Sequence, residues 1–330
     1  MPLIEVKNLK TSFYTEDGVV VAVDGVDFVI ERRKTLGVVG ESGCGKSVTA
    51  LTIMGLVQTP PGRIESGEIL FYRGEEIIDL VSLDPKGPEM RAIRGKEIAM
   101  IFQEPMTSLN PVYTIGNQIM EAIMLHQHLR KAQAKEAAIE VLRAVGISSP
   151  EQRVKEYPHQ LSGGMRQRAM IAMALSCNPS LLIADEPTTA LDVTIQAQVL
   201  KLMNDLRRKY EMAILYITHD LGVIAHIADD VIVMYLGKVV ESASVREIFH
   251  HPLHPYTQGL MKSIPSLAAT GKEKLVPIVG VVPDPYELPR GCGFEPRCPN
   301  RVDRCSQGAP TLVEARPGHK VACWFNSERK

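Results

Sequence analysis

The sequence predicts an α/β fold with a helical insertion, and three observations carry that prediction. Short apolar runs that suit buried parallel strands occur at residues 181–184 and 213–217. Another apolar run, residues 36–39, leads into a glycine-rich turn, after which a helix is expected to begin at Lys46. Residues 118–144 are rich in Ala, Leu, Met, Glu and Lys, with apolar residues at helical spacing. We therefore expect strands and helices to alternate around one long helical segment.

The rest of the chain can be interpreted in order. Residues 1 to about 95 read as short strands and turns, beginning with an alternating apolar and charged strand. From Ile98 to about residue 146 the pattern becomes helical, and from residue 161 to 240 strands and helices alternate. After Pro252 the composition shifts to proline, glycine and cysteine, which predicts a loop-rich appendage that needs a cross-link because it has few apolar residues to bury.

The composition is that of an ordinary globular protein. Of 330 residues, 45% are hydrophobic and 23% are charged, which excludes a disordered tail, a coiled-coil rod and a collagen-like fibre. The 37 Lys and Arg residues nearly balance the 38 Asp and Glu residues. Because no basic excess would neutralise phosphates, we expect no nucleic-acid partner. No apolar run approaches the roughly 18 residues of a membrane span, and the start lacks a secretory signal, so we place the chain in the cytoplasm.

A phosphate-binding loop is the strongest motif. Residues 40–47 fit the pattern G-x-x-x-x-G-K-[ST] between a predicted strand and a predicted helix. Glycines let backbone N–H groups surround a phosphate, Lys46 reaches the β- and γ-phosphates, and Ser47 binds Mg²⁺. Cys44 occupies a free position of the motif, either as a small space-filling side chain or as a redox brake. The residues expected to contact ATP here are Gly40, Ser42, Gly43, Cys44, Gly45, Lys46, Ser47 and Val48.

Two adjacent carboxylates follow the apolar run at 181–184. Asp185 is expected to bind Mg²⁺, and Glu186 is expected to orient and deprotonate the attacking water. Together with the phosphate-binding loop, the pair predicts ATP hydrolysis.

A family resemblance adds further site residues. Residues 161–165, Leu-Ser-Gly-Gly-Met, resemble the signature sequence of ATP-binding cassette (ABC) proteins, with Met165 where glutamine is usual. The resemblance implies that two cassettes face each other and that the signature of one contacts the γ-phosphate held by the other. The residues that would act in this way are Ser162, Gly163 and Gly164, at a helix N-terminus that attracts anions.

The same resemblance implies four smaller elements. Gln103 resembles the Q-loop residue that senses the γ-phosphate and contributes to the Mg²⁺ site, and residues 190–192 resemble the D-loop. His219 resembles the switch histidine that contacts the γ-phosphate. Phe13 resembles the aromatic residue that stacks on adenine, with Tyr14 as the alternative and ordinary core packing as the competing interpretation.

Longer stretches, at residues 102–111, 185–194 and 251–257, resemble the ATPase subunits of dipeptide and oligopeptide importers. The resemblance implies a RecA-like P-loop ATPase core with an N-terminal antiparallel β subdomain and a helical insertion at about 96–160. The cassette would occupy residues 1–250, and a small cysteine-rich extension would occupy 251–330. The implied partners are a second ATPase subunit, two membrane permeases and, indirectly, an extracytoplasmic peptide-binding protein. The chain would lie as a peripheral protein at the cytoplasmic face of the inner membrane.

Three alternatives to a peptide importer remain at this point. The ATPase subunits of nickel importers share much of the sequence in these stretches, so the cargo can be nickel or another small solute. A soluble ABC protein of translation or DNA maintenance is disfavoured because the chain has one phosphate-binding loop and no long heptads. A module that binds ATP without hydrolysing it is disfavoured because Glu186 and His219 are both present.

Four of the six cysteines lie near the C-terminus: Cys292, Cys298, Cys305 and Cys323. Their spacing lacks the paired C-x2–4-C pattern that is usual for zinc, which favours a [4Fe–4S] cluster over Zn²⁺. The resemblance adds that some tails of this kind bind such a cluster. Unmetallated thiols and incidental disulfides are the remaining alternatives. If a metal is present, we expect it to be a structural cross-link.

Overall fold

The computed structural model describes residues 1–103, 108–189, 191–263 and 277–327. Contacts between Cα atoms divide the chain into two compact units, each of which is described separately. The first unit comprises Met1–Leu3, Ile30–Thr35 and Ser82–Ile217. The second comprises Ile4–Val29, Leu36–Val81 and Thr218–Lys330. Within the described residues, no helix has both the length and the apolar character needed to cross a bilayer.

The first unit contains three neighbouring parallel strands, β6 (Ile98–Ile101), β7 (Leu181–Asp185) and β8 (Ala213–Thr218). Every residue of β7 and β8 is buried, as the apolar runs predicted for strands in the middle of a sheet. The prediction of helix from Ile98 onward is wrong at its start. Residues 98–101 form β6 because four apolar residues in a row can be buried on both faces of a strand.

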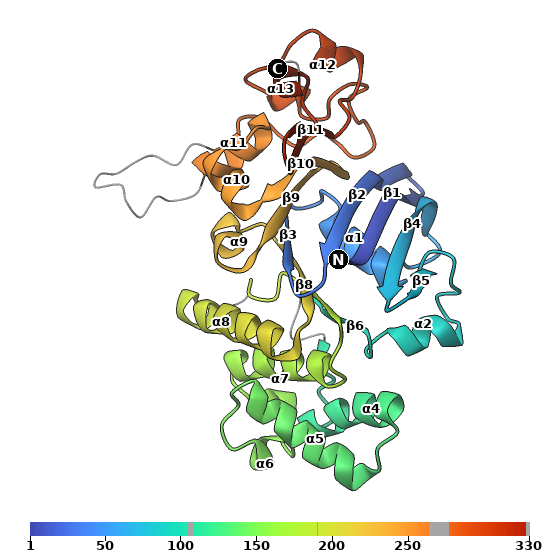
Figure 1. Cartoon of the computed structure of the whole chain (residues 1–330), viewed down its shortest axis with the longest axis vertical. Coiled ribbons are helices and arrows are strands. Elements are labelled where there is room, and N and C mark those ends of the chain that lie inside the picture. The colour runs from blue at the N-terminus through green and yellow to red at the C-terminus, as the bar shows by residue number, and fades with distance from the viewer. Residues whose placement is uncertain (104–107, 190, 264–276, 328–330) are drawn as a thin grey trace, which may run out of the picture. The chain divides into compact units, whose positions relative to one another are not determined.

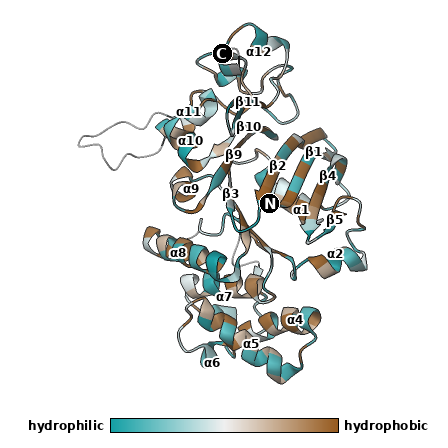
Figure 2. Ribbon diagram, in the orientation of Figure 1, coloured by the Kyte–Doolittle hydropathy of each residue, from teal (hydrophilic) through white to brown (hydrophobic). Residues whose placement is uncertain are grey.

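The predicted helical segment is two helices, α4 (Ile115–Gln127) and α5 (Lys131–Ala144). Thr114 caps α4, since its Oγ1 accepts the N–H of Asn117 at 3.2 Å, and His128 ends the helix in the left-handed conformation. Figure 2 shows both hydrophobic and hydrophilic residues along the two helices, as expected of amphipathic helices. The remaining helices of this unit are α2 (Pro88–Ile93), α6 (Pro150–Arg153), η1 (Pro158–Gln160), α7 (Gly163–Leu175) and α8 (Val193–Tyr210).

The second unit contains a four-stranded antiparallel sheet in the order β2-β1-β4-β5 (Figure 1). Its strands are β1 (Pro2–Thr15), β2 (Gly18–Glu31), β4 (Gly62–Arg73) and β5 (Glu76–Asp79). Ile4 lies opposite Phe71 in the β1–β4 pair, and both side chains are buried. These strands confirm the predicted N-terminal strand, although β1 and β2 are longer than the short strands expected.

A second set of strands in this unit follows the order β11-β12-β10-β9-β3. The β3–β9 pair is parallel, and the other pairs are antiparallel. The strands are β3 (Thr35–Val39), β9 (Asp230–Tyr235), β10 (Lys238–Ser244), β11 (Val313–Arg316) and β12 (His319–Val321). The helices are α1 (Lys46–Ile53), α9 (Leu221–Ile227), α10 (Val245–His250), α11 (Pro255–Lys262), η2 (Glu295–Arg297), α12 (Arg304–Gln307) and α13 (Trp324–Ser327).

The C-terminal segment, residues 251–263 and 277–327, forms a small aromatic core with Tyr235 of β9, which was not predicted from the sequence. The rings of Tyr235, Tyr256 and Phe294 pack with centroids 4.7 to 5.4 Å apart. Tyr256 and Phe294 are both buried. Aromatic side chains bury large areas, so three of them from distant parts of the sequence compensate for a segment with few aliphatic residues.

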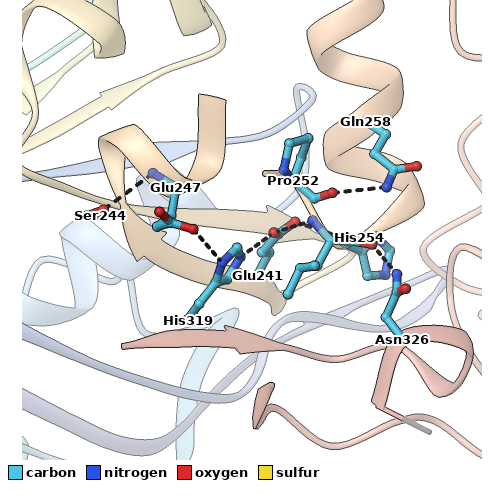
Figure 3. Close-up of polar contacts among 9 residues, drawn as sticks. Glu241, Ser244, Glu247, Pro252, His254, Gln258, His319 and Asn326 are labelled. Carbon is cyan, nitrogen blue, oxygen red and sulfur yellow. Dashed lines mark hydrogen bonds and ion pairs between the residues drawn. The ribbon is translucent and has the colours of Figure 1, made fainter. Parts of the chain in front are cut away.

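A buried carboxylate also joins this segment to β10 (Figure 3). Glu241 is fully buried and accepts the N–H groups of Leu253 at 2.7 Å and His254 at 2.9 Å. Nε2 of His319, on β12, lies 2.7 Å from the Oε1 atom of Glu241. A buried charge is tolerated only when such partners replace water, so the three contacts fix α11 and β12 against β10.

Candidate functional site

The phosphate-binding loop connects β3 to α1 in the second unit, as predicted. Gly45 has a φ of 96°, and an added Cβ would lie 2.1 Å from the carbonyl oxygen of Ala22. Only glycine fits there, because a side chain would meet both backbone strain and a backbone atom. Gly43 also has a positive φ, of 80°, but its Cβ position is open space. The loop is therefore closely packed behind Gly45 and open at Gly43.

The first turn of α1 is left free for an anion. Gly45 is the N-cap and makes no side-chain capping bond, and no acidic residue lies in the first turn. Uncapped N–H groups and the positive end of the helix dipole attract a phosphate. Ser42 and Gly43 are exposed, and Ser47 and Val48 are half-buried. This arrangement suits the binding of a nucleotide phosphate.

Lys46 is buried, and its ammonium group lies over the start of the loop. It donates to the carbonyl oxygens of Gly40 at 2.8 Å and Glu41 at 3.0 Å. Its Nζ also lies 3.8 Å from the sulfur of Cys44. Burial raises the pKa of Cys44, against the lowering effect of Lys46, so this thiol stays protonated at neutral pH. A protonated, buried thiol agrees with the space-filling role and not with a redox brake.

The predicted catalytic carboxylates lie at the end of β7 in the first unit. Asp185 is its last residue, and both Asp185 and Glu186 are buried. Glu186 has a φ of 45°, which is costly for a residue with a side chain and is found most often where function requires it. Its Oε2 atom accepts Nε2 of Gln103 at 3.1 Å and the hydroxyl of Thr189 at 3.1 Å. The structure thus brings Gln103 and Glu186 into direct contact.

The signature residues begin α7 in the first unit. Ser162 is the N-cap, and its Oγ accepts the N–H of Met165 at 3.3 Å. Ser162 and Gly163 are exposed, Gly164 is half-buried, and a Cβ on Gly163 would meet nothing within 4 Å. The helix start is therefore open to an anion from outside the unit.

The start of α8 shows the same kind of helix cap. Asp192 is the N-cap and accepts the N–H of Ile195 at 2.9 Å, while Val193 is 80% exposed. Of the predicted D-loop, Ala190 lies outside the described residues. In the importer-like stretch at 102–111, residues 104–107 also lie outside the described residues.

Two further predicted residues lie in the second unit with the phosphate-binding loop. His219 is exposed between β8 and α9. Phe13 is half-buried on β1, where it lies opposite Gly62. Tyr14 is half exposed, and its hydroxyl donates to Oε1 of Glu65 at 2.8 Å. That contact occupies the Tyr14 hydroxyl.

The sequence predicts that the four C-terminal cysteines hold a metal. No three His, Cys, Asp or Glu side chains gather to hold a metal ion anywhere in residues 1–103, 108–189, 191–263 and 277–327. Burial raises the pKa of Cys292 and Cys323, and it raises the pKa of Cys298 to about 11. Metals bind thiolates, so Cys292, Cys298 and Cys323 would have to lose their protons for a metal to bind. The iron–sulfur cluster therefore stays a prediction.

Two residues that contact the start of the phosphate-binding loop were not identified from the sequence. Tyr256 and Arg297 come from the C-terminal segment, and both bind Glu41. Tyr256 lies in the importer-like stretch 251–257, but neither this tyrosine nor Arg297 belongs to a nucleotide-binding motif. The only signal in the sequence was the uncompensated charge of Glu41 inside a loop that binds anions.

Comparisons with known proteins agree with this geometry. A family model described as "ABC transporter" matches residues 23–189. A second, described as "Oligopeptide/dipeptide transporter, C-terminal region", matches residues 240–305. The second match includes Cys292, Cys298 and Cys305 and ends before Cys323.

Individual relatives cover nearly the whole chain. The oligopeptide transport ATP-binding protein AppD of Bacillus subtilis is 55% identical over 99% of this chain and 97% of its own. The dipeptide transport ATP-binding protein DppD of the same organism is 49% identical over 99% and 96%. Among solved structures, the dimeric bacterial ABC transporter cassette MJ0796 has a TM-score of 0.64 and 25% identity over 74% of this chain and 99% of its own. The chain therefore belongs to the ABC transporter ATPases and carries the C-terminal region of the oligopeptide and dipeptide transporter group.

Proposed function

We propose that this chain is the ATP-hydrolysing subunit of a membrane importer of dipeptides and oligopeptides. The observation that carries the proposal is the combination, in one chain, of a complete phosphate-binding loop with the peptide-transporter C-terminal region. The names of the Bacillus subtilis relatives, which refer to oligopeptide and dipeptide transport, support peptide as the cargo. No residue of this chain is assigned to the peptide itself.

The phosphate-binding loop accounts for the first step, which is ATP binding. The open N–H groups around Gly43 and the first turn of α1 hold the β- and γ-phosphates, and Lys46 neutralises their charge. Ser47, Asp185 and Gln103 would hold Mg²⁺, because hydroxyl, carboxylate and amide oxygens suit a hard cation. When bound, Mg²⁺ supplies positive charge to the transferred phosphoryl group.

Glu186 accounts for the second step, which is hydrolysis. Its carboxylate accepts hydrogen bonds from Gln103 and Thr189, which fix its orientation. A carboxylate held in this way can take the proton of an attacking water. His219 contacts the γ-phosphate, and Ser162 and Gly163 of a second cassette close the site from the opposite side. Phosphate release removes the contacts shared by two cassettes, so the pair reopens.

The assembly follows from the same proposal. This chain pairs with a second, related ATPase subunit, with a homodimer as the alternative, and the pair binds two membrane permeases. An extracytoplasmic peptide-binding protein delivers the cargo, and the chain lies at the cytoplasmic face of the inner membrane as a peripheral subunit. The proposed division is a cassette at 1–250 and an extension at 251–330. The partner cassette in the dimeric MJ0796 structure supports pairing.

The extension is proposed to be cysteine-rich and cross-linked, with a [4Fe–4S] cluster as the first candidate and Zn²⁺ as the second. Cys292, Cys298 and Cys323 would have to lose their protons for either to bind. Anaerobic purification followed by iron, sulfide and zinc assays tests this separately from ATPase activity. Protein without any of the three would reject the cross-link.

Substitution of the proposed general base tests the ATPase assignment. Glu186→Gln should reduce hydrolysis by at least about 100-fold while leaving ATP binding intact, because the amide cannot accept the proton. Glu140→Gln, an exposed position on α5, is the control and should hydrolyse ATP normally. Purified Glu186→Gln protein with MgATP should form a dimer, alone or with its partner subunit. Undiminished hydrolysis in Glu186→Gln would contradict the mechanism.

The cargo needs its own test. The chain, co-expressed with the permeases encoded beside it, should support uptake of labelled dipeptide into vesicles that contain ATP. Uptake of nickel without uptake of peptide would replace peptide with the alternative cargo.

A further inference from the structure

The C-terminal segment contacts the phosphate-binding loop through one residue, Glu41. Arg297 donates from Nη1 to Oε2 of Glu41 at 2.6 Å and from Nη2 to Oε1 at 3.0 Å. The hydroxyl of Tyr256 accepts the backbone N–H of Glu41 at 2.8 Å. Glu41 is the second residue of the loop and is separated from Arg297 by 256 positions in the sequence. Both its side chain and its backbone are thus held from outside the loop.

Arg297 is buried and held in a fixed orientation. Its side chain is only 4% exposed, and its guanidinium carbon lies 5.8 Å from the ring centre of Tyr235 and 5.9 Å from that of Phe294. Nη1 also donates to the hydroxyl of Tyr235 at 3.3 Å, and Nε donates to the carbonyl of Val279 at 3.3 Å. Hydrogen bonding to Glu41 raises the pKa of Arg297, so the guanidinium is charged at any physiological pH. A planar, bidentate arginine enclosed by rings resists rotation, so it fixes the position of the carboxylate that it binds.

Glu41 in turn leads directly to Lys46. The ammonium group of Lys46 donates to the carbonyl oxygens of Gly40 and Glu41. The residue held by Arg297 and Tyr256 therefore also carries one of the two carbonyl groups that orient the phosphate-binding lysine. A displacement of Glu41 would move that carbonyl and with it the charge that faces the phosphates.

We infer that Arg297 is a positioning residue for ATP binding: by holding Glu41 in a bidentate ion pair, it makes the C-terminal segment part of the nucleotide site. The inference rests on the proposed ATPase function. It assigns the segment a role beyond the cassette's own chemistry, because the loop keeps its binding geometry only while Arg297 is in place. The segment then influences ATP affinity directly, whatever cross-link it contains.

The test compares full-length variants of the purified protein. Arg297→Ala should raise the Kd and the KM for MgATP about tenfold, since a hydrogen bond to a charged group is worth about one power of ten in an equilibrium. Its kcat at saturating ATP should stay within about twofold of the parent protein, because no catalytic group is removed. Arg297→Lys should recover part of the affinity, because lysine keeps the charge but not the bidentate geometry.

A double-mutant cycle separates positioning from general stability. Glu41→Gln should weaken ATP binding as Arg297→Ala does, and the double variant should be no weaker than the weaker single variant. Arg301→Ala is the matched control in the same segment, because the Arg301 side chain is exposed and pairs with Glu295, away from Glu41 in sequence and contact among the described residues. It should bind ATP as the parent protein does.

Each outcome decides the inference. Folded Arg297→Ala that binds ATP with the parent Kd, even with a lower melting temperature, would overturn it and leave only a structural ion pair. If Arg297→Ala does not fold, Glu41→Gln decides: an unchanged Kd in that variant refutes positioning. A parent protein that neither binds nor hydrolyses ATP would instead refute the proposed function itself.

Discussion

Acidification should selectively loosen the C-terminal segment, because His254 is buried in a neutral form. This residue is 1% exposed, its Nδ1 accepts the N–H of Tyr256 at 3.0 Å, and its ring also hydrogen-bonds to the backbone of Ala322. Burial lowers the pKa of His254 from 6.5 to about 4, although the neighbouring Glu241 acts in the opposite direction. Between these two pH values His254 is therefore neutral in the folded chain and protonated in the unfolded chain.

The size of the effect follows from that difference. Between pH 6.5 and about pH 4 only the unfolded state binds the proton, so the free energy of unfolding falls as the pH falls through this window. Each pKa unit corresponds to about 1.4 kcal/mol, which gives a loss of about 2 kcal/mol between pH 7 and pH 5. The loss should level off below about pH 4, where both states are protonated.

Trp324 provides the assay, because it is the single tryptophan of the chain and lies in the same segment. Urea titrations followed by its fluorescence at pH 7 and pH 5 give the two free energies of unfolding. His254→Asn should reduce this dependence, since asparagine can still accept the N–H of Tyr256 but does not titrate. The exposed His250→Asn serves as the control and should behave as the parent protein. Equal pH dependence in the parent protein and His254→Asn would refute the reasoning.

Two further substitutions test the packing of the second unit. Gly45→Ala should lower the melting temperature and abolish ATP binding, because its Cβ would lie 2.1 Å from a backbone oxygen. Gly308→Ala is the control, because Gly308 has an extended backbone and an added Cβ meets nothing within 4 Å, so this variant should fold and bind ATP. Equal melting temperatures in the two variants would contradict the prediction. His319→Ala should destabilise the C-terminal segment by about 3 kcal/mol, because the fully buried carboxyl group of Glu241 would lose its ring partner. Urea unfolding followed by tryptophan fluorescence measures that loss, and a change below about 1 kcal/mol would show that water replaces the histidine.

Much of the architecture could be predicted because local patterns determine it. A strand with every residue buried, such as β7, needs a run of apolar residues, and the glycine pattern before Lys46 requires one kind of turn. The start at Ile98 was misread because four apolar residues fit either a strand or a buried helix turn, and the choice depends on the neighbouring strand. The spacing of apolar residues along the sequence does not show that residues 98–101 pair with β7.

The least predictable part is what the chain brings together across long separations. Glu41 and Arg297 lie 256 residues apart, and the aromatic core around Phe294 draws on β9, α11 and the segment after residue 277. Such contacts depend on the tertiary fold, so a single sequence gives no sign of them. The prediction of a loop-rich appendage counted apolar residues within the segment alone, so it did not include the ring contacts that the segment makes with Tyr235 on β9.

The two hydrogen bonds that hold the ammonium group of Lys46 affect the rate at which ATP can bind. A lysine in solution samples many rotamers, and fixing one of them costs up to about 2 kcal/mol. In this chain the entropy cost of fixing the rotamer is incurred once, during folding, because two main-chain carbonyl oxygens already restrain the side chain before ATP binds. Each triphosphate that binds then meets an ammonium group that is already held beside the loop. The cost of ordering the lysine side chain is therefore not repeated in later turnovers.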